Sequence, residues 1–131
     1  MSKLIDTFPV LTLVLLQSLR NAGREALADQ IDAALITRIT FDSEANAGYI
    51  YLESSRQLNV VETNIVGVRH GETIPVETQF LTNIDTDNFG RLVGIEILNP
   101  GVLKIELSKR ATRGQKVWHF CHFRETGKNG K

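Results

Sequence analysis

The sequence is poor in the features that most often reveal a function directly. Its 131 residues include a single cysteine, Cys121, which excludes an intrachain disulfide and a zinc site with several cysteine ligands. The apolar stretch LTLVLLQSL at residues 11–19 is too short to span a bilayer, so no membrane partner is expected. The sequence also lacks a phosphate loop, a GxSxG elbow, an HExxH helix and a dinucleotide-binding fingerprint. It therefore predicts no catalytic residue, no metal site and no cofactor.

The N-terminal region does not have the pattern of a secretory signal. Lys3 is the only basic residue before the apolar stretch, Asp6 follows it, and a small-residue cleavage site is missing. We therefore expect a cytoplasmic, unprocessed protein. The composition, 42% hydrophobic and 23% charged, is that of an ordinary globular chain. A chain of this length can bury roughly two-thirds of its unfolded surface, so residues 1–131 are expected to form a single domain.

The net charge is zero, but the charges are distributed unevenly. Residues 1–100 hold 7 basic and 13 acidic side chains, whereas residues 101–131 hold 8 basic and 2 acidic ones. Such asymmetry can mark a binding surface. It can equally reflect attraction between the two parts within the fold, and both interpretations stay open at this point.

Two segments near the N-terminus have the spacing of amphipathic helices. In residues 8–20, one stripe contains Val10, Leu11, Val14, Leu15 and Leu19. In residues 24–36, one face contains Leu27, Gln30, Ile31, Ala34 and Leu35. Gly23, in the short joint NAG, can end the first helix in the left-handed conformation. Residues 1–37 therefore predict a helical hairpin.

The pattern then changes to the alternation that is typical of strands. Strands are expected at residues 38–41, 48–54, 58–66, 78–84, 91–98 and 116–123. Residues 102–107, VLKIEL, are expected as a strand with a short helix as the alternative, and RHGETIP at 69–75 is expected as a loop. The sequence thus predicts an α+β domain, with the helical hairpin packed on one face of a mostly antiparallel sheet of about six strands. After the hairpin, it divides into a β core (38–98) and a basic C-terminal β extension (99–131).

Residues 85–98, DTDNFGRLVGIEIL, resemble a calcium loop at first sight. Asp85, Asp87, Gly90 and Glu96 occupy positions 1, 3, 6 and 12 of an EF-hand loop, but position 5 is Phe89, which has no side-chain oxygen. The flanking segments are also strand-like, whereas an EF-hand needs helices. A hairpin explains more, because Asp85 and Asp87 favour a turn and Gly90 supplies a positive φ.

Gly94 lies in the middle of the second expected strand of this hairpin. Glycine in a strand interior weakens the strand, so it often marks a place where another group approaches the backbone closely. We expect a packed helix or an aromatic ring to lie against Gly94.

Two blocks, FDSEANAGYIYL (41–52) and NIDTDNFGRLVGIEIL (83–98), resemble the small-domain family called domain of unknown function 2283. The matching residues of the first block are Phe41, Asp42, Tyr49, Ile50 and Leu52. Those of the second are Asp85, Asp87, Gly90, Gly94, Ile95, Glu96, Ile97 and Leu98. Asn46 and Gly48 depart from the family pattern, and VRHGETIPVET lengthens the middle. The resemblance spans residues 41–98 and implies a small β-rich unit with no agreed biochemical role.

An acidic pocket is one candidate site. It would form if Asp42, Glu44, Asp85, Asp87 and Glu96 converge, because paired carboxylates can hold a hard cation or share a proton. The favoured interpretation is that all but Glu96 are turn residues facing water. Glu96 would then pair with Arg38 or Arg91 across the sheet.

The C-terminal region offers two further candidates. In WHFCHF, His119 and Cys121 share a strand face, as a metal site or a Cys–His pair would need, but an ordinary strand is favoured. The basic side chains near these aromatic rings suit single-stranded RNA. They are Lys109, Arg110, Arg113, Lys116 and Arg124.

We rank a non-catalytic protein-binding domain first. In this hypothesis an acidic surface covers the basic active site of a nuclease-type toxin, as in bacterial immunity proteins and antitoxins. The candidate partner-binding residues are Glu44, Glu72, Glu77, Asp85 and Asp87. A small carboxylate-based enzyme or metal-binding domain is the alternative, and an RNA-binding accessory protein is the second alternative. The sequence does not predict the oligomeric state.

Overall fold

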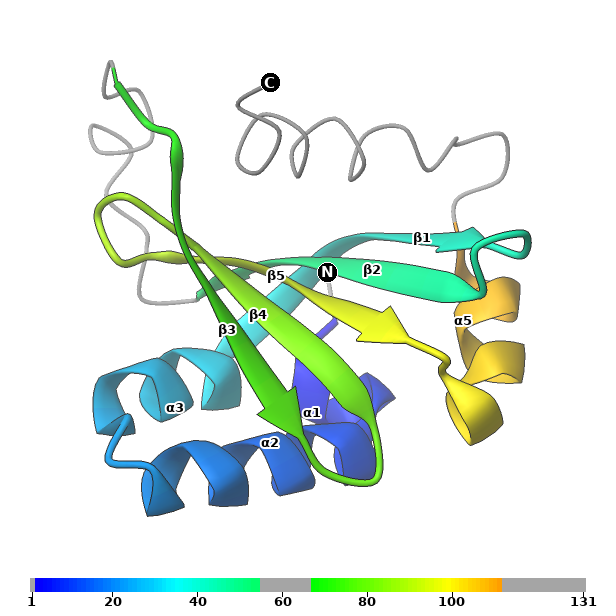
Figure 1. Cartoon of the computed structure of the whole chain (residues 1–131), viewed down its shortest axis with the longest axis horizontal. Coiled ribbons are helices and arrows are strands. Elements are labelled where there is room, and N and C mark those ends of the chain that lie inside the picture. The colour runs from blue at the N-terminus through cyan, green and yellow to red at the C-terminus, as the bar shows by residue number, and fades with distance from the viewer. Residues whose placement is uncertain (1, 55–66, 112–131) are drawn as a thin grey trace.

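The computed structural model describes residues 2–54 and 67–111, and Figure 1 shows their arrangement. The elements of these residues, in chain order, are α1 (Leu4–Thr7), α2 (Pro9–Asn21), α3 (Glu25–Asp32), β1 (Ala34–Asp42), β2 (Ala47–Ser54), β3 (His70–Glu77), β4 (Leu81–Asp87), β5 (Leu92–Leu98), η1 (Gly101–Leu103) and α5 (Lys104–Arg110). No helix in this part of the chain is long and apolar enough to cross a membrane.

The strands form one antiparallel sheet. Within the described residues it has five strands in the order β1-β2-β5-β4-β3, so that β1 and β3 are its edges. The pairing of β2 with β5 joins the two halves, with Tyr49 opposite Glu96 and Tyr51 opposite Gly94. The predicted α+β class and the antiparallel sheet are confirmed. The strands expected at 58–66 and 116–123 lie outside the described residues.

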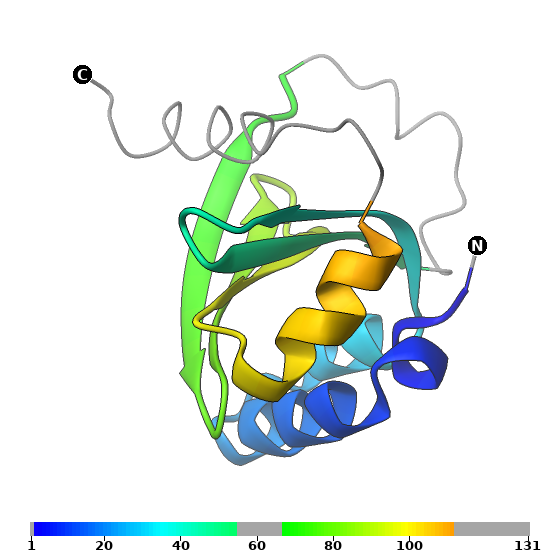
Figure 2. The same ribbon diagram turned by 90° about the vertical axis from the view of Figure 1, so that its right-hand side faces the viewer.

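The core lies between one face of the sheet and the helices. Leu11, Leu15 and Leu19 of α2 are buried, as are Leu27, Ala28 and Ile31 of α3. They pack in one apolar cluster with sheet residues such as Ile50, Ile84, Ile95 and Ile97. Figure 2 shows α1, α2, α3 and α5 on the same side of the sheet. The other face of the sheet carries the polar side chains described below.

The N-terminal helices largely follow their sequence signals. Pro9 stands at the first helical position of α2, where proline is tolerated, and Gly23 follows the helix with φ +80°. The helix expected at 24–36 is shorter, because α3 ends at Asp32 and β1 begins at Ala34. The helical spacing had placed residues 34–36 in this helix. In the structure Ala34 and Ile36 instead pair with β2, so the backbone of this segment forms strand hydrogen bonds.

Two expectations about the β core and its extension were wrong. Residues 69–75 were expected as a loop, but β3 begins at His70, with Ile74 and Val76 buried against the core. Pro75 is compatible with this because β3 is an edge strand.

Residues 102–107 were expected as a strand, but they continue from η1 into α5. Leu103 and Leu107, four residues apart, both face the core, which is the spacing of a helix. The basic β extension is therefore helical from Gly101 to Arg110, and its residues after Ala111 lie outside the described part of the chain.

Candidate functional site

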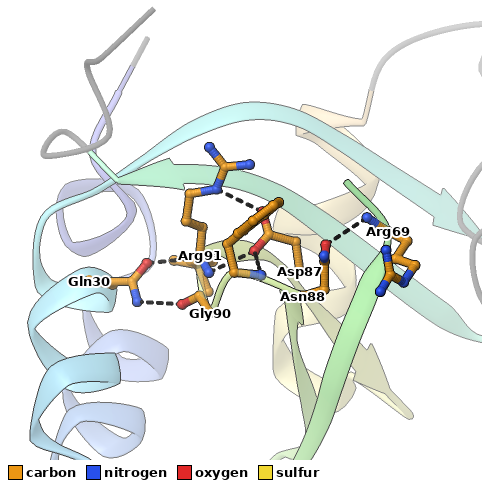
Figure 3. A network of polar contacts seen from close by, with 8 residues as sticks. Gln30, Arg69, Asp87, Asn88, Gly90 and Arg91 are labelled. Carbon is orange, nitrogen blue, oxygen red and sulfur yellow. Dashed lines mark hydrogen bonds and ion pairs between the residues drawn. The ribbon is translucent and has the colours of Figure 1, made fainter. Parts of the chain in front are cut away.

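The acidic stretch forms the turn between β4 and β5, as the hairpin hypothesis predicted. Asp87 Oδ1 accepts hydrogen bonds from the backbone N–H groups of Phe89 (2.8 Å) and Arg91 (2.9 Å). Its Oδ2 accepts from Arg91 Nε at 2.8 Å, and Gly90 has φ +80°. Figure 3 shows these contacts. Asp87 therefore closes the turn with both of its oxygens.

Two neighbouring elements hold the tip of this hairpin. Gln30 of α3 donates from Nε2 to the Gly90 carbonyl at 3.0 Å, and its Oε1 accepts the Leu92 N–H at 2.9 Å. On the other side, Asn88 Oδ1 accepts the Arg69 N–H at 2.8 Å, just before β3 (Figure 3). The glutamine thus fixes the helical layer to the hairpin through both halves of its amide.

Asp85 is buried in a hydrogen-bonded network on the polar face of the sheet. Its Oδ2 accepts the Tyr49 O–H at 2.8 Å, and its Oδ1 accepts the Thr73 O–H at 2.6 Å. His70 Nε2 lies 2.8 Å from Thr73 Oγ1 and 3.7 Å from Asp85 Oδ1. Because the single hydroxyl proton of Thr73 goes to Asp85, the imidazole N–H donates to Thr73.

The expectation that Asp85 and Asp87 face water was wrong. Their relative exposures are 0% and 7%. The physical reason is that β4 continues to Asp87, so Asp85 is a strand residue paired between Thr73 and Gly94. Its oxygens therefore meet side chains from β2 and β3 instead of solvent.

Gly94 makes the Tyr49 contact possible. It pairs with Tyr51 on one side and Asp85 on the other. A Cβ atom at Gly94 would lie 2.4 Å from Tyr49 Cε1 and 2.6 Å from the Ile50 carbonyl oxygen. The ring of Tyr49 therefore crosses the space that a side chain would fill and reaches Asp85 on β4. The expected aromatic neighbour of Gly94 is confirmed.

Burial raises the pKa of the Tyr49 hydroxyl well above its usual range, and the nearby Asp85 carboxylate raises it further. The hydroxyl is consequently a hydrogen-bond donor and not a base. On the same face, Glu96 Oε1 accepts a hydrogen bond from Asn83 Nδ2 at 3.1 Å. Arg38 or Arg91 was expected as the partner of Glu96, and Asn83 was not foreseen. Arg91 pairs with Asp87.

These contacts assign structural roles to the acidic residues of the motif. Asp85, Asp87 and Glu96 all accept hydrogen bonds from protein donors. Asp42 holds the β1–β2 turn by accepting the Glu44 N–H at 3.0 Å, and β2 and β5 separate β1 from β4. Within residues 2–54 and 67–111, no group of three or more His, Cys, Asp or Glu is arranged to hold a metal ion.

The predicted partner-binding acids do not form one surface. Glu44 lies in the turn next to edge strand β1, whereas Glu72 and Glu77 lie on the opposite edge strand, β3. Glu72 Oε2 is 2.9 Å from Arg24 Nη2, so its charge is largely compensated. Asp85 and Asp87 are buried, as described above. An acidic surface made by these five residues is therefore not what the fold presents.

Of the basic candidates, the structure describes two. Lys109 and Arg110 are exposed in the last turn of α5, and Arg110 Nε pairs with Glu106. Arg113, Lys116 and Arg124 lie outside the described residues, as do His119 and Cys121.

The described part of the chain also contains a hollow of about 320 Å³ between the α2–α3 joint, β3 and the hairpin tip. Arg24 and Glu72 pair with each other at its lining, and Gln30 is held by the hairpin. These three polar side chains of the hollow are thus already engaged within the fold.

The sequence interpretation missed a different surface, on the outer side of α2 and α3. We call it the helical face. It consists of Val10, Leu13, Gln17 and Arg20 of α2, and Glu25, Asp29 and Asp32 of α3, all of which are exposed. Val10 had been assigned to the buried stripe, yet it is 55% exposed, and Leu13 is 56% exposed. The spacing 10, 13, 17, 20 was the available signal, since it marks the side of α2 opposite Leu11, Leu15 and Leu19.

An ion-pair network joins the two helices across this face. Arg20 Nη1 lies 2.6 Å from Glu25 Oε1 and 3.4 Å from Asp29 Oδ1. The hydrogen bond to Glu25 is the main reason that the pKa of Arg20 is raised. Arg20 thus pairs with two of the three carboxylates of the helical face, which combines two exposed aliphatic side chains with a negative balance of charge.

The fold and the motif geometry define a small α+β domain whose antiparallel sheet is organised around an acidic hairpin. Residues 38–99 match the model of the family described as Protein of unknown function (DUF2283), which confirms the resemblance seen in the sequence. The matched segment contains β2, β3, β4, β5 and the part of β1 from Arg38 onward, while α1, α2, α3, η1 and α5 lie outside it. A search of the curated proteins and a search of the solved structures each found no match.

Proposed function

We propose that this chain is a non-catalytic protein-binding domain whose partner docks on the helical face. The observation that carries the proposal is the exposure of Val10 and Leu13, at 55% and 56%, on a helix whose other face is buried. Apolar surface rimmed by polar residues is a common mark of a protein interaction site. Docking a partner would remove these two side chains from water.

The chemistry of the partner follows from the charges around the aliphatic pair. Glu25, Asp29 and Asp32 outnumber Arg20 on this face. A partner with a basic surface around an apolar spot would be complementary, and charge would steer the encounter. We therefore propose a bacterial, cytoplasmic protein of the immunity or antitoxin kind, which neutralises a nuclease-type toxin by covering its basic active site.

The alternatives have weaker support. A carboxylate-based enzyme would depend on Asp85 and Asp87, whose oxygens are already used by the network and the turn. RNA binding through the basic segment would depend mainly on residues outside the described part of the chain.

The experiment is affinity capture from the native host with the full chain. One variant, Val10→Gln with Leu13→Gln, removes the aliphatic surface with good helix formers. A matched control, Glu44→Gln with Glu77→Gln, alters two of the originally expected acids elsewhere on the fold. We expect the wild type and the control to retain the same protein and the helical-face variant to lose it. Equal capture by all three, or specific loss in the control, would reject the helical face, and no specific capture by the wild type would reject the proposal.

A further inference from the structure

A second exposed aliphatic surface lies on η1 and α5. Val102 is 85% exposed and Ile105 is 71% exposed, the two highest values among the large exposed hydrophobic side chains of the described residues. Leu107 points the other way and is fully buried, where it packs against Gly48. Val102, Ile105 and Lys109 follow helical spacing and share the outward side. We call these three residues the α5 face.

The α5 face and the helical face have complementary chemistry. Both contain two exposed aliphatic side chains. Around the α5 face, Lys104, Lys109 and Arg110 outnumber Glu106, which pairs with Arg110. Around the helical face, the balance is negative. A surface that is aliphatic and basic therefore exists on the same chain as one that is aliphatic and acidic.

The two faces cannot meet within one molecule in this fold. The α5 helix packs on the sheet near β1, through Leu107 and Gly48, whereas α2 and α3 cover another part of the same side. Figure 1 shows α5 beside the β1–β2 hairpin and apart from α3. Both faces point outward from the core, so contact between them requires two molecules.

We propose that a second copy of this chain docks its α5 face on the helical face of the first. Because the two surfaces differ, the contact is heterologous and leaves one free face of each kind on the pair. Few side chains are involved, so the association is weak and reversible. The docking site of the second copy rests on the proposed function, because it is the face assigned to the partner. Self-association and partner binding are therefore mutually exclusive.

A mixing experiment tests this geometry in sedimentation velocity runs on the full chain. Variant one is Val10→Gln with Leu13→Gln, and variant two is Ile105→Gln with Lys109→Gln. All four positions are exposed, and unchanged unfolding midpoints verify that both variants fold. We expect the wild type to associate with rising concentration and each variant alone to stay monomeric. An equimolar mixture should form a dimer that does not grow further, because one intact face of each kind remains available.

Three outcomes would overturn the inference. The wild type could stay monomeric throughout the concentration series, variant two could associate like the wild type, or the mixture could stay monomeric although the wild type associates. The proposed function is judged separately, by host capture. Suppose that variant two still captures the host protein, variant one does not, and the wild type does not self-associate. This result would contradict the docking of a second copy and would still support the partner site on the helical face.

Discussion

At the scale of single residues, the acidic motif is explained by the fold. Asp87 closes the turn, Asp85 anchors Tyr49 and Thr73, and Gly94 leaves room for the ring. The turn was predictable because Asp and Gly signals act locally. The burial of Asp85 was not, since its partner Tyr49 is 36 residues away and only the strand order brings them together.

A first prediction concerns the space at Gly94. Gly94→Ala places a methyl group against the Tyr49 ring and the Ile50 carbonyl, and should destabilise the domain by roughly 1–3 kcal/mol. Gly48→Ala is the matched control, because its methyl group would first meet the flexible end of Leu107, at 2.9 Å. Urea unfolding measures both. A loss for Gly94→Ala no larger than that for Gly48→Ala would contradict the close packing described here.

A second prediction concerns the Tyr49 hydroxyl. Tyr49→Phe leaves one oxygen of the buried Asp85 carboxylate without its tyrosine donor, so the free energy of unfolding should fall by about 1–3 kcal/mol. The same variant changes the response to alkaline pH. The pKa of Tyr49 is higher in the folded state than in the unfolded state, where it is about 10.

The stabilisation from the raised pKa is fully present below the unfolded value and is lost as the pH rises beyond it. Above about pH 10, the free energy of unfolding of the wild type should therefore fall more steeply than that of Tyr49→Phe, by up to about 1.4 kcal/mol per pH unit. Unfolding curves of the two proteins between about pH 8 and about pH 11 give the comparison. Parallel loss of stability in both would argue against a buried Tyr49 hydroxyl.

A third prediction concerns metal ions at the acidic residues. The oxygens of Asp85 and Asp87 already accept hydrogen bonds from protein donors, so millimolar calcium, magnesium, manganese or zinc should leave the melting temperature unchanged. An ion present at about a thousand times its dissociation constant would add about 4 kcal/mol to the free energy of unfolding. A clear upward shift, abolished by Asp85→Asn with Asp87→Asn, would favour the metal-binding alternative.

At the scale of elements, local signals were sufficient where they agreed with packing. Pro9 and Gly23 delimit α2, and alternation predicted most of β2 and β5. The signals failed where two patterns coincide, because VLKIEL alternates and also places Leu103 and Leu107 one helical turn apart. In β3, Gly71 and Pro75 suggested a loop, and the edge position that accommodates Pro75 is not visible in the sequence.

A fourth prediction concerns the link between α3 and the hairpin. Gln30→Ala removes the partner of the Leu92 N–H and of the Gly90 carbonyl, and should cost about 1–3 kcal/mol of stability. Gln17→Ala on the outer side of α2 is the matched control and should stay within about 0.5 kcal/mol of the wild type. Chemical unfolding of both variants measures the difference. Equal effects would mean that the link adds no stability.

At the scale of the whole molecule, composition and pattern predicted the α+β class and the uneven charge. They did not predict which surfaces would be exposed. Val10 appeared to belong to the buried stripe, because a helix rich in aliphatic residues on all sides does not show from its sequence which side meets the sheet. The expected acids were selected by charge alone, and the fold distributes them between two sheet edges and the interior.

The central claim is that the sheet carries the motif and that the outer side of α2 and α3 carries the binding surface. Hydroxyl-radical footprinting of the chain with its captured host partner tests this most directly, at a concentration where the free chain is monomeric. We predict that oxidation of Val10 and Leu13 decreases in the complex, while that of Phe89, exposed at the hairpin tip, does not change. Protection of Phe89 with unchanged Val10 and Leu13 would contradict the account.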